Sequence, residues 1–145
     1  MIALIQRVTA AEVSVAGIAC ARIDAGLLAF IGIRPEDGAA EAAALLDRVL
    51  DYRLFADEAG RMNRSLRDLG GGLLLVPQFT LAADTRKGLR PGFSTAAAPQ
   101  QAEALFAALV ARARHLHPTV SAGRFGEHMQ VSLINDGPVT FWLES

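Results

Sequence analysis

A Gly-Pro pair near the end of the chain, Gly137-Pro138, has the clearest potential for chemistry. It separates two apolar runs, residues 129–134 and 139–143, that are typical of strands. Proline lacks a backbone N–H and is excluded from central strands, whereas glycine adopts backbone angles that other residues avoid. We therefore expect a rigid kink where a sheet should form. It is either a hairpin turn or a device that presents backbone carbonyls to a ligand.

A second run of similar character, residues 76–81, follows the apolar segment 73–75. Polar Gln78 and Thr80 alternate there with Phe79 and Leu81, directly after Pro77. The Thr80 hydroxyl could act as a nucleophile, but no His or Lys is adjacent in the sequence to serve as its base. We expect Thr80 to support the site, or simply to form a local hydrogen bond from a strand, and not to attack a substrate.

The sequence lacks the motifs of metal-binding and phosphate-binding sites. The three histidines, at positions 115, 117 and 128, have no metal-ligand spacing, so we expect no metal and no cofactor. His115 and His117 are adjacent to Pro118, which favours a structural role at a helix end. The glycines at 70–72 precede a strand and not a helix, so they do not form a phosphate-binding loop. A single cysteine, Cys20, excludes an internal disulfide and indicates a buried thiol in a reducing compartment.

Composition limits the class of protein and its partners. The 145 residues suit one compact domain, residues 1–145, and 52% of them are hydrophobic, which is ample for a core. The formal net charge is −1, which argues against a protein that coats a nucleic-acid backbone. An RNA partner would have to be contacted locally, at an end. No signal peptide or membrane-spanning run is recognisable, so we expect a cytoplasmic protein that binds neither membrane nor DNA.

Hydrophobic periodicity predicts an α/β protein. Two segments have helical spacing, and the helices are too few to cover both faces of a doubly wound sheet. We expect residues 82–94, which are rich in Gly, Arg and Pro, to form an irregular loop. The helices are predicted at 35–50 and 100–114, and the strands at 1–9, 12–15, 18–23, 27–33, 52–55, 73–76, 120–125, 129–134 and 139–143.

The two unusual runs, together with Arg7 in Ile5-Gln6-Arg7-Val8, resemble the D-aminoacyl-tRNA deacylase family. The resemblance covers nearly the whole chain, and the order and spacing of its motifs are more specific than any one motif. It implies a three-layer α/β/β domain of mixed and antiparallel sheets with two main helices, working as a homodimer. The other motifs that carry it are Gly26-Leu27-Leu28, Met62-Asn63, Arg90-Pro91-Gly92-Phe93-Ser94, Gly123-Arg124-Phe125 and Met129-Gln130-Val131-Ser132-Leu133.

The resemblance implies hydrolysis of the ester bond in D-aminoacyl-tRNA, and in glycine mischarged on alanine tRNA, with the ribose 2′-hydroxyl assisting. Backbone N–H groups around Gln78 and Phe79 are the candidates for stabilising the oxyanion. The carbonyls of Gly137-Pro138 would hold the substrate α-amino group. With the ester carbonyl also held, a backbone wall rejects an L side chain and admits a D side chain or glycine. The resemblance further implies that the Gly-Pro bond is cis and enters the partner subunit's pocket.

Two other groups gain roles from the resemblance, and three loop cations are candidates from their charge alone; each has a simpler alternative. Arg7 would hold the Gly-Pro motif in place, or it is a surface arginine at a strand edge. Phe125 and Met129 would line a pocket for the terminal adenine, or they are a core pair. The loop cations Arg86, Lys87 and Arg90 would meet phosphates, or they are solvated.

Pro77 departs from the family pattern, which usually has Ser at this position. A sister family that removes L-alanine mischarged on threonine tRNA has Pro-Gln here but lacks the following Phe, so Phe79 and Arg7 favour the D-specific family. Two alternatives therefore stay open. One is a sister-type deacylase with relaxed chirality, and the other is a module that binds the tRNA end without turnover.

Overall fold

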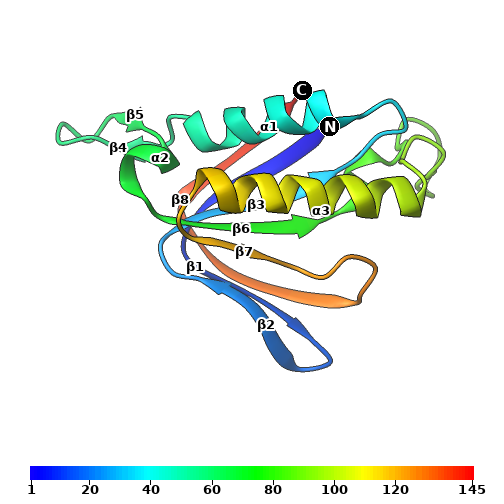
Figure 1. Ribbon diagram of the computed structural model, residues 1–145, viewed down its shortest axis with the longest axis horizontal. Coiled ribbons are helices and arrows are strands. Elements are labelled where there is room, and N and C mark those ends of the chain that lie inside the picture. Colours follow the sequence, from blue (N-terminus) through cyan, green and yellow to red (C-terminus); the bar gives the residue numbers. More distant parts are fainter.

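The computed structural model describes all 145 residues as a strongly bent six-stranded sheet with helices on one side (Figure 1). The strand order is β2-β1-β3-β6-β7, and β8 pairs with β1. β3, β6 and β7 are parallel and the other pairs are antiparallel. The elements are β1 (Ile2–Val15), β2 (Ile18–Ile23), β3 (Gly26–Gly32), α1 (Ala39–Asp51), β4 (Phe55–Ala56), β5 (Met62–Arg64), α2 (Leu66–Leu69), β6 (Gly72–Pro77), the 3₁₀ helix η1 (Phe79–Ala82), α3 (Pro99–Leu116), β7 (Val120–Ala122) and β8 (Met129–Glu144).

One sheet supplies both β layers, so the expectation of separate stacked sheets is wrong. β1 is a single strand of 14 residues and β8 one of 16, and strands of this length bend as they twist. β1 pairs with β3 over residues 2–8 and with β2 over residues 11–15. A main core of 24 buried residues lies between helices and sheet, and a smaller core of seven fills the bend. The α/β class is confirmed, with the second β layer formed by the curled part of the same sheet (Figure 1).

The two predicted main helices are present. α1 buries the predicted apolar residues at helical spacing, but it begins at Ala39 and not at Pro35. The reason is that Asp37 turns inward, where its carboxylate accepts from the Met1 ammonium group at 2.5 Å and from the Arg34 N–H at 2.6 Å. Gly38 then caps the helix, and its N–H donates to the Glu41 carboxylate at 2.9 Å.

Short elements were predicted less well. The strand expected at 52–55 is reduced to Phe55–Ala56, and the one at 120–125 ends at Ala122. Helix α2 was not predicted, although Ser65 and Asp68 form a capping box at its start. The Ser65 Oγ accepts from the Asp68 N–H at 3.2 Å, and the Ser65 N–H donates to the Asp68 carboxylate at 2.7 Å. Gly70 closes α2 in the left-handed region with φ +65°, so the triple glycine is a loop entry, as predicted.

The histidine and cysteine side chains near the core have structural partners. His117 is buried at the end of α3, with Nε2 2.6 Å from the Gly71 carbonyl, which agrees with its predicted structural role. The half-buried thiol of Cys20 donates to the Val13 carbonyl at 3.4 Å. None of the helices combines the length and the apolar character required to cross a bilayer.

Candidate active site

The Gly-Pro pair lies in a bulge within β8, so the hairpin interpretation is wrong. Gln6 of β1 pairs with Thr140 and Val8 pairs with Asn135, which leaves residues 136–139 of β8 opposite Arg7 alone. The strand continues on both sides of this bulge. The Gly137-Pro138 peptide bond is cis, as the resemblance implied, and Gly137 has φ +144°.

Side chains from both strands brace the bulge. The Asn135 amide closes it, because its Oδ1 accepts from the Val139 N–H at 2.7 Å and its Nδ2 donates to Thr140 Oγ1 at 3.0 Å. Arg7 braces it from β1, donating from Nε to the Asp136 carbonyl at 2.9 Å and from Nη1 to the Leu54 carbonyl at 2.7 Å. The Arg7 side chain is only 17% exposed and lies on a central strand. The alternative interpretation, a surface arginine at a strand edge, is therefore wrong.

We expect Arg7→Ala to lower the free energy of unfolding by about 2–3 kcal/mol, because two carbonyls lose a charged donor. Urea denaturation measures this loss. The matched control is Asp136→Asn, which removes a carboxylate that is 54% exposed and 3.4 Å from Arg7 Nε but keeps the backbone carbonyl. Its effect should stay below about 0.5 kcal/mol, since exposed ion pairs contribute little. Equal losses in both variants would contradict the bracing role.

The second run leaves the sheet instead of continuing as a strand. Pro77 ends β6, and Phe79 and Thr80 open the single 3₁₀ turn η1, so the expected alternation of Thr80 along a strand is wrong. The Gln78 N–H donates to the Ile31 carbonyl at 2.8 Å and is therefore occupied. Phe79 and Thr80 stand at the start of η1, where N–H groups lack a partner within the helix, and neither residue donates any of the backbone hydrogen bonds outside the helices and strands. Of the two expected oxyanion donors, Phe79 is the free one.

The Thr80 hydroxyl is exposed and bonded to its neighbour. It accepts from Gln78 Nε2 at 2.6 Å, and no basic side chain is bonded to it. Without a base, the hydroxyl stays protonated and nucleophilic attack is unfavourable. The arrangement therefore agrees with a supporting role.

Pro77 also determines where the sheet opens. In the β6–β7 ladder the Leu73 N–H donates to the Thr119 carbonyl at 2.9 Å, and the Gly123 N–H donates to the Leu75 carbonyl at 2.8 Å. The next donor in this alternation would be residue 77, where proline has none. β7 accordingly ends at Ala122, and residues 123–128 leave the sheet.

A cavity of about 430 Å³ lies where this loop leaves the sheet. It brings Gln78 and Phe79, the candidates for stabilising the oxyanion, together with Phe125 and Met129, the candidates for the adenine pocket. The Phe125 ring centroid is 6.5 Å from that of Phe106, so Phe125 also packs on the main core, and Met129 packs on the smaller one. Sequence reasoning did not group the rest of the lining with them, because only the fold brings β6, the start of α3 and the loop before β8 together. These residues are Val76, Pro77, Ala97, Pro99, Ala102, Gly126, Glu127, His128 and Val131.

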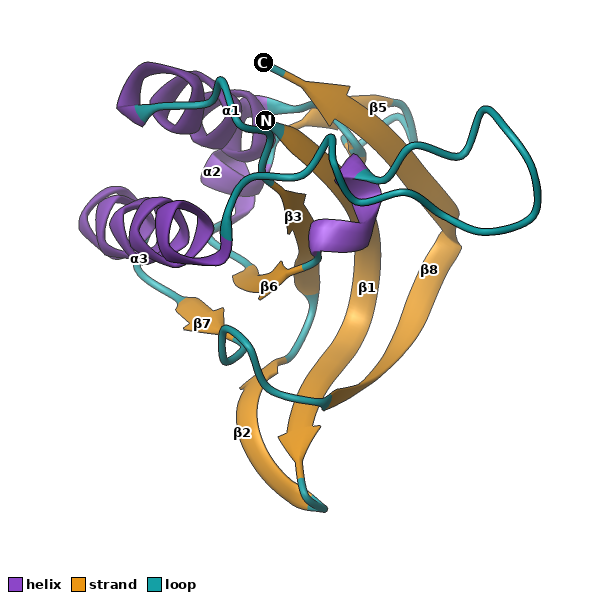
Figure 2. Ribbon diagram, turned by 90° about the vertical axis from the view of Figure 1, so that its right-hand side faces the viewer, coloured by secondary structure: helices purple, strands orange, loops and turns teal.

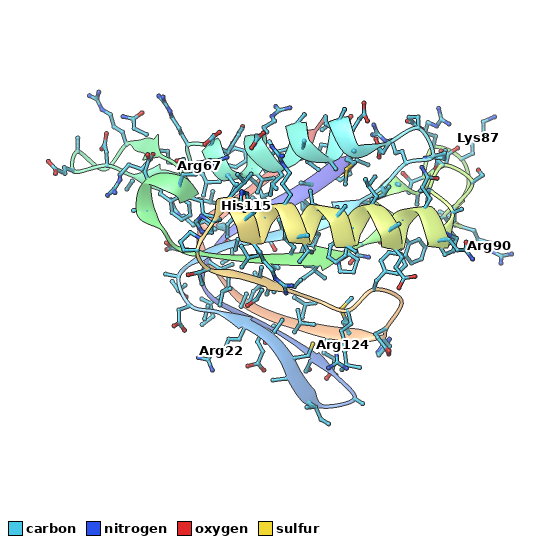
Figure 3. All side chains as sticks on the ribbon, viewed as in Figure 1. Arg22, Arg67, Lys87, Arg90, His115 and Arg124 are labelled. Carbon is cyan, nitrogen blue, oxygen red and sulfur yellow. The ribbon has the colours of Figure 1, made fainter.

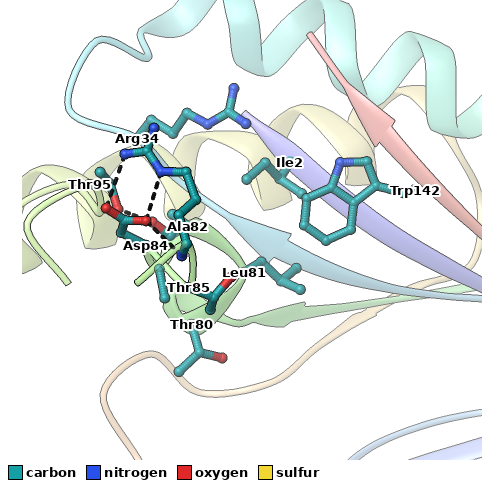
Figure 4. Close-up of a pocket in the computed structure, with 11 residues that line it drawn as sticks. Ile2, Arg34, Thr80, Leu81, Ala82, Asp84, Thr85, Thr95 and Trp142 are labelled. Atoms are coloured by element: carbon teal, nitrogen blue, oxygen red, sulfur yellow. Dashed lines mark hydrogen bonds and ion pairs between the residues drawn. The ribbon is translucent and has the colours of Figure 1, made fainter. Parts of the chain in front are cut away.

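A second, shallower cavity of about 610 Å³ lies on the other side of η1 (Figure 4). Ile2 and Trp142 form one wall and Thr80 lies at the other. Its charged side chains are all ion-paired, and Arg34 pairs with Glu144 outside the lining at 3.2 Å. Arg86 donates to the Asp84 carboxylate at 2.9 and 3.0 Å, which lowers the pKa of Asp84 to about 2 and raises the pKa of Arg86.

The two halves of the expected site are separate within one chain. Gly137 and Pro138 line neither cavity. Strands β1 and β3 lie between β8 and β6, so the direct path crosses three strand spacings of about 4.8 Å, roughly 14 Å in all. The structure has no group of three or more His, Cys, Asp or Glu side chains that could hold a metal ion.

The matching family model and the curated relatives agree on one family. A family model described as D-Tyr-tRNA(Tyr) deacylase matches residues 4–144. Proteins named D-aminoacyl-tRNA deacylase from Azotobacter vinelandii and Alkalilimnicola ehrlichii are 62% and 61% identical over all of this chain, covering 100% and 97% of their own lengths. A solved structure titled c-Myc DNA Unwinding Element Binding Protein superposes with a TM-score of 0.96 at 37% identity, covering 100% of this chain and 99% of that one. A probable eukaryotic D-amino acid tRNA deacylase, at 17% identity and a TM-score of 0.83 over 99% of this chain and 98% of its own, shows the same fold.

Proposed function

The chain belongs to the D-Tyr-tRNA(Tyr) deacylase family, and on that premise we propose that it hydrolyses D-aminoacyl-tRNA. Water adds to the ester carbonyl, the bond to the ribose oxygen breaks, and free amino acid and tRNA are released. We extend the proposal to glycine mischarged on alanine tRNA. The observation that carries it is the braced Gly-cis-Pro bulge, which holds two backbone carbonyls rigidly.

The cavity between η1 and α3 suits the terminal adenosine. Phe125 and Met129 offer an aromatic ring and a soft thioether to the base, and base–aromatic contacts commonly contribute ~1–3 kcal/mol each. The free Phe79 N–H lies beside this cavity, where it can stabilise the oxyanion by ~3–4 kcal/mol. The ribose 2′-hydroxyl of the substrate assists hydrolysis, and Thr80 supports the turn through Gln78. The reaction as proposed needs no metal or cofactor.

A homodimer completes the site. Because the Gly-Pro pair and the cavity are separate within one chain, we propose that Gly137-Pro138 of one subunit enters the cavity region of the other. β8 exposes apolar side chains for such a contact, with Ile134 64% and Trp142 48% exposed. The inserted backbone would hold the α-amino group of the substrate and block an L side chain by steric clash. A D side chain or glycine passes.

Pro77 supports one rival within the same class. A proline at this position is shared with the sister-type deacylases that accept L-alanine, and here it shapes the cavity by ending the β6–β7 ladder. Phe79 and the bracing Arg7 favour the D-specific function. A tRNA-end binding module without turnover is the remaining alternative.

Side-by-side hydrolysis of D-tyrosyl-, L-tyrosyl-, glycyl- and L-alanyl-tRNA, with and without a chelator, tests the function. We expect loss of the D-tyrosyl and glycyl esters alone, at rates that the chelator does not change. Hydrolysis of L-alanyl-tRNA at a comparable rate would establish the relaxed filter. Binding without loss of any ester, at stoichiometric enzyme, would establish the binding module. We place the activity in the cytoplasm, where aminoacyl-tRNA is made.

A further inference from the structure

The segment 84–92 is an arch anchored to the candidate site. Asp84 and Gly92 close its base with two backbone hydrogen bonds of 2.8 and 2.9 Å. The Phe93 ring, next to the base, packs against Phe79 of η1 with centroids 5.1 Å apart, and Thr95 Oγ1 donates to the Ala82 carbonyl at 2.6 Å. The loop containing the arch projects past β8 at the right of Figure 2. The base of the arch therefore has a defined position relative to the Phe79 N–H, the proposed oxyanion donor. The tip of the arch extends away from the sheet.

The tip combines free positive charge with an exposed apolar side chain. Leu89 is fully exposed, with a relative accessibility of 103%. Lys87 and Arg90 flank it and have no hydrogen-bond or ion-pair partner, in contrast to Arg86, which Asp84 neutralises. Lys87 and Arg90 both project from the end of the molecule at the right of Figure 3. An exposed carboxylate, Glu127, lines the nearby cavity, whereas the two unpaired cations lie at the tip of the arch.

We propose that Lys87, Leu89 and Arg90 bind the acceptor stem of tRNA where its duplex meets the unpaired 3′ end. This inference rests on the proposed function, because it starts from the terminal adenosine in the cavity. The tip is three to four residues from the base of the arch, which is a reach of up to ~14 Å. About four stacked nucleotides at roughly 3.4 Å each span a similar length.

The chemistry of each side chain fits this junction. Lys87 and Arg90 neutralise phosphates on the strand that leads into the cavity, and Leu89 packs on the exposed face of the last base pair. Two local phosphate contacts also reconcile an RNA substrate with a chain whose formal net charge is −1.

The test is the salt dependence of binding, measured with uncharged tRNA so that it does not depend on turnover. For the double variant Lys87→Gln, Arg90→Gln we expect about tenfold weaker binding near 0.1 M salt and a log–log salt slope smaller by ~1.5–2. Leu89→Ser should weaken binding with an unchanged slope. The matched control is Arg53→Gln, Arg61→Gln, which removes two exposed arginines without ion-pair partners elsewhere on the surface. It should leave affinity and slope at wild-type values.

A second arm separates this inference from the proposed function. We expect the Lys87, Arg90 variant to lose kcat/KM on D-tyrosyl-tRNA but not on D-tyrosyl-adenosine, which lacks the stem. Equal losses on both substrates, an unchanged salt slope, or loss of the dimer on Leu89→Ser would overturn the inference. Equally strong competition by duplex DNA of random sequence would also overturn it, by showing a general polyanion surface. Failure of the wild type to hydrolyse either ester would refute the proposed function, while the binding arm would still decide the role of the arch.

Discussion

Gly137→Ala is expected to lower kcat/KM for D-tyrosyl-tRNA by about 100-fold or more. A Cβ on Gly137 would lie 2.6 Å from Val139 Cγ2, 3.0 Å from the Val139 backbone nitrogen and 3.3 Å from Arg7 Nη2. Each of these atoms belongs to the framework that holds the bulge. The backbone angle, φ +144°, is also one that L side chains rarely adopt, at a typical cost of ~1–3 kcal/mol. The backbone around Gly137 must therefore shift. Displacements of ångström scale near the reacting atoms cost ~100-fold in rate.

Gly60→Ala is the matched control for this prediction. Gly60 also has a positive φ, +76°, but a Cβ there meets nothing within 4 Å and the residue lies in the turn between β4 and β5. We expect it to carry a similar backbone cost and to keep wild-type turnover. Single-turnover kinetics on D- and L-tyrosyl-tRNA, with circular dichroism to confirm folding, provide the comparison. A folded Gly137→Ala protein with normal kinetics would remove the Gly-Pro pair from the site.

Two nearly inactive variants are expected to restore activity when their chains are mixed. One carries Gly137→Ala, and the other carries Phe125→Ala with Met129→Ala, which empties the proposed adenine cavity. In a mixed dimer one site combines an intact cavity with the intact Gly-Pro pair of the other subunit. Random assembly makes about half of the dimers mixed, so about a quarter of wild-type activity should return. Activity on D-tyrosyl-tRNA after co-refolding measures the recovery.

The control for the mixing experiment is each variant refolded alone, which should stay inactive. Native mass spectrometry of the mixture shows whether mixed dimers have formed. Mixed dimers without recovered activity would mean that each site is built from one chain, against the geometric argument from the strand order. Absence of dimers of any kind would refute the homodimer itself.

Local patterns predicted the helices and most strands well, because each buries a regular apolar face. Leu45, Leu46 and Val49 of α1 and Leu73 to Leu75 of β6 illustrate this. The continuity of β1 was not predictable in the same way. Ala10 and Ala11 interrupt the pattern weakly, and only the long partner strand β8 shows that residues 2–15 form one strand. The single bent sheet follows from that pairing, which no local pattern records.

The candidate site, like the fold, could be predicted from the sequence only in part. The sequence singled out Phe125 and Met129 and also Gln78 and Phe79, and the fold brings all four into the lining of one cavity. The allocation of hydrogen bonds was not predictable from sequence. The Gln78 N–H bonds to Ile31, 47 positions earlier, and Arg7 reaches Leu54 and Asp136 from a third part of the chain. Such choices depend on strand register, which is set by the whole sheet.

The pairing of β1 with β8 also has a consequence for biosynthesis. Ile2 pairs with Glu144, so the first strand made must wait for the last one before its outer edge is covered. Contacts of such long sequence separation slow folding, because loop closure precedes their stabilisation. The bulge and its arginine brace form only at this final step. A nascent chain on the ribosome can therefore complete the Gly-Pro bulge only after β8 (Met129–Glu144) has been made, when nearly the whole chain has been synthesised.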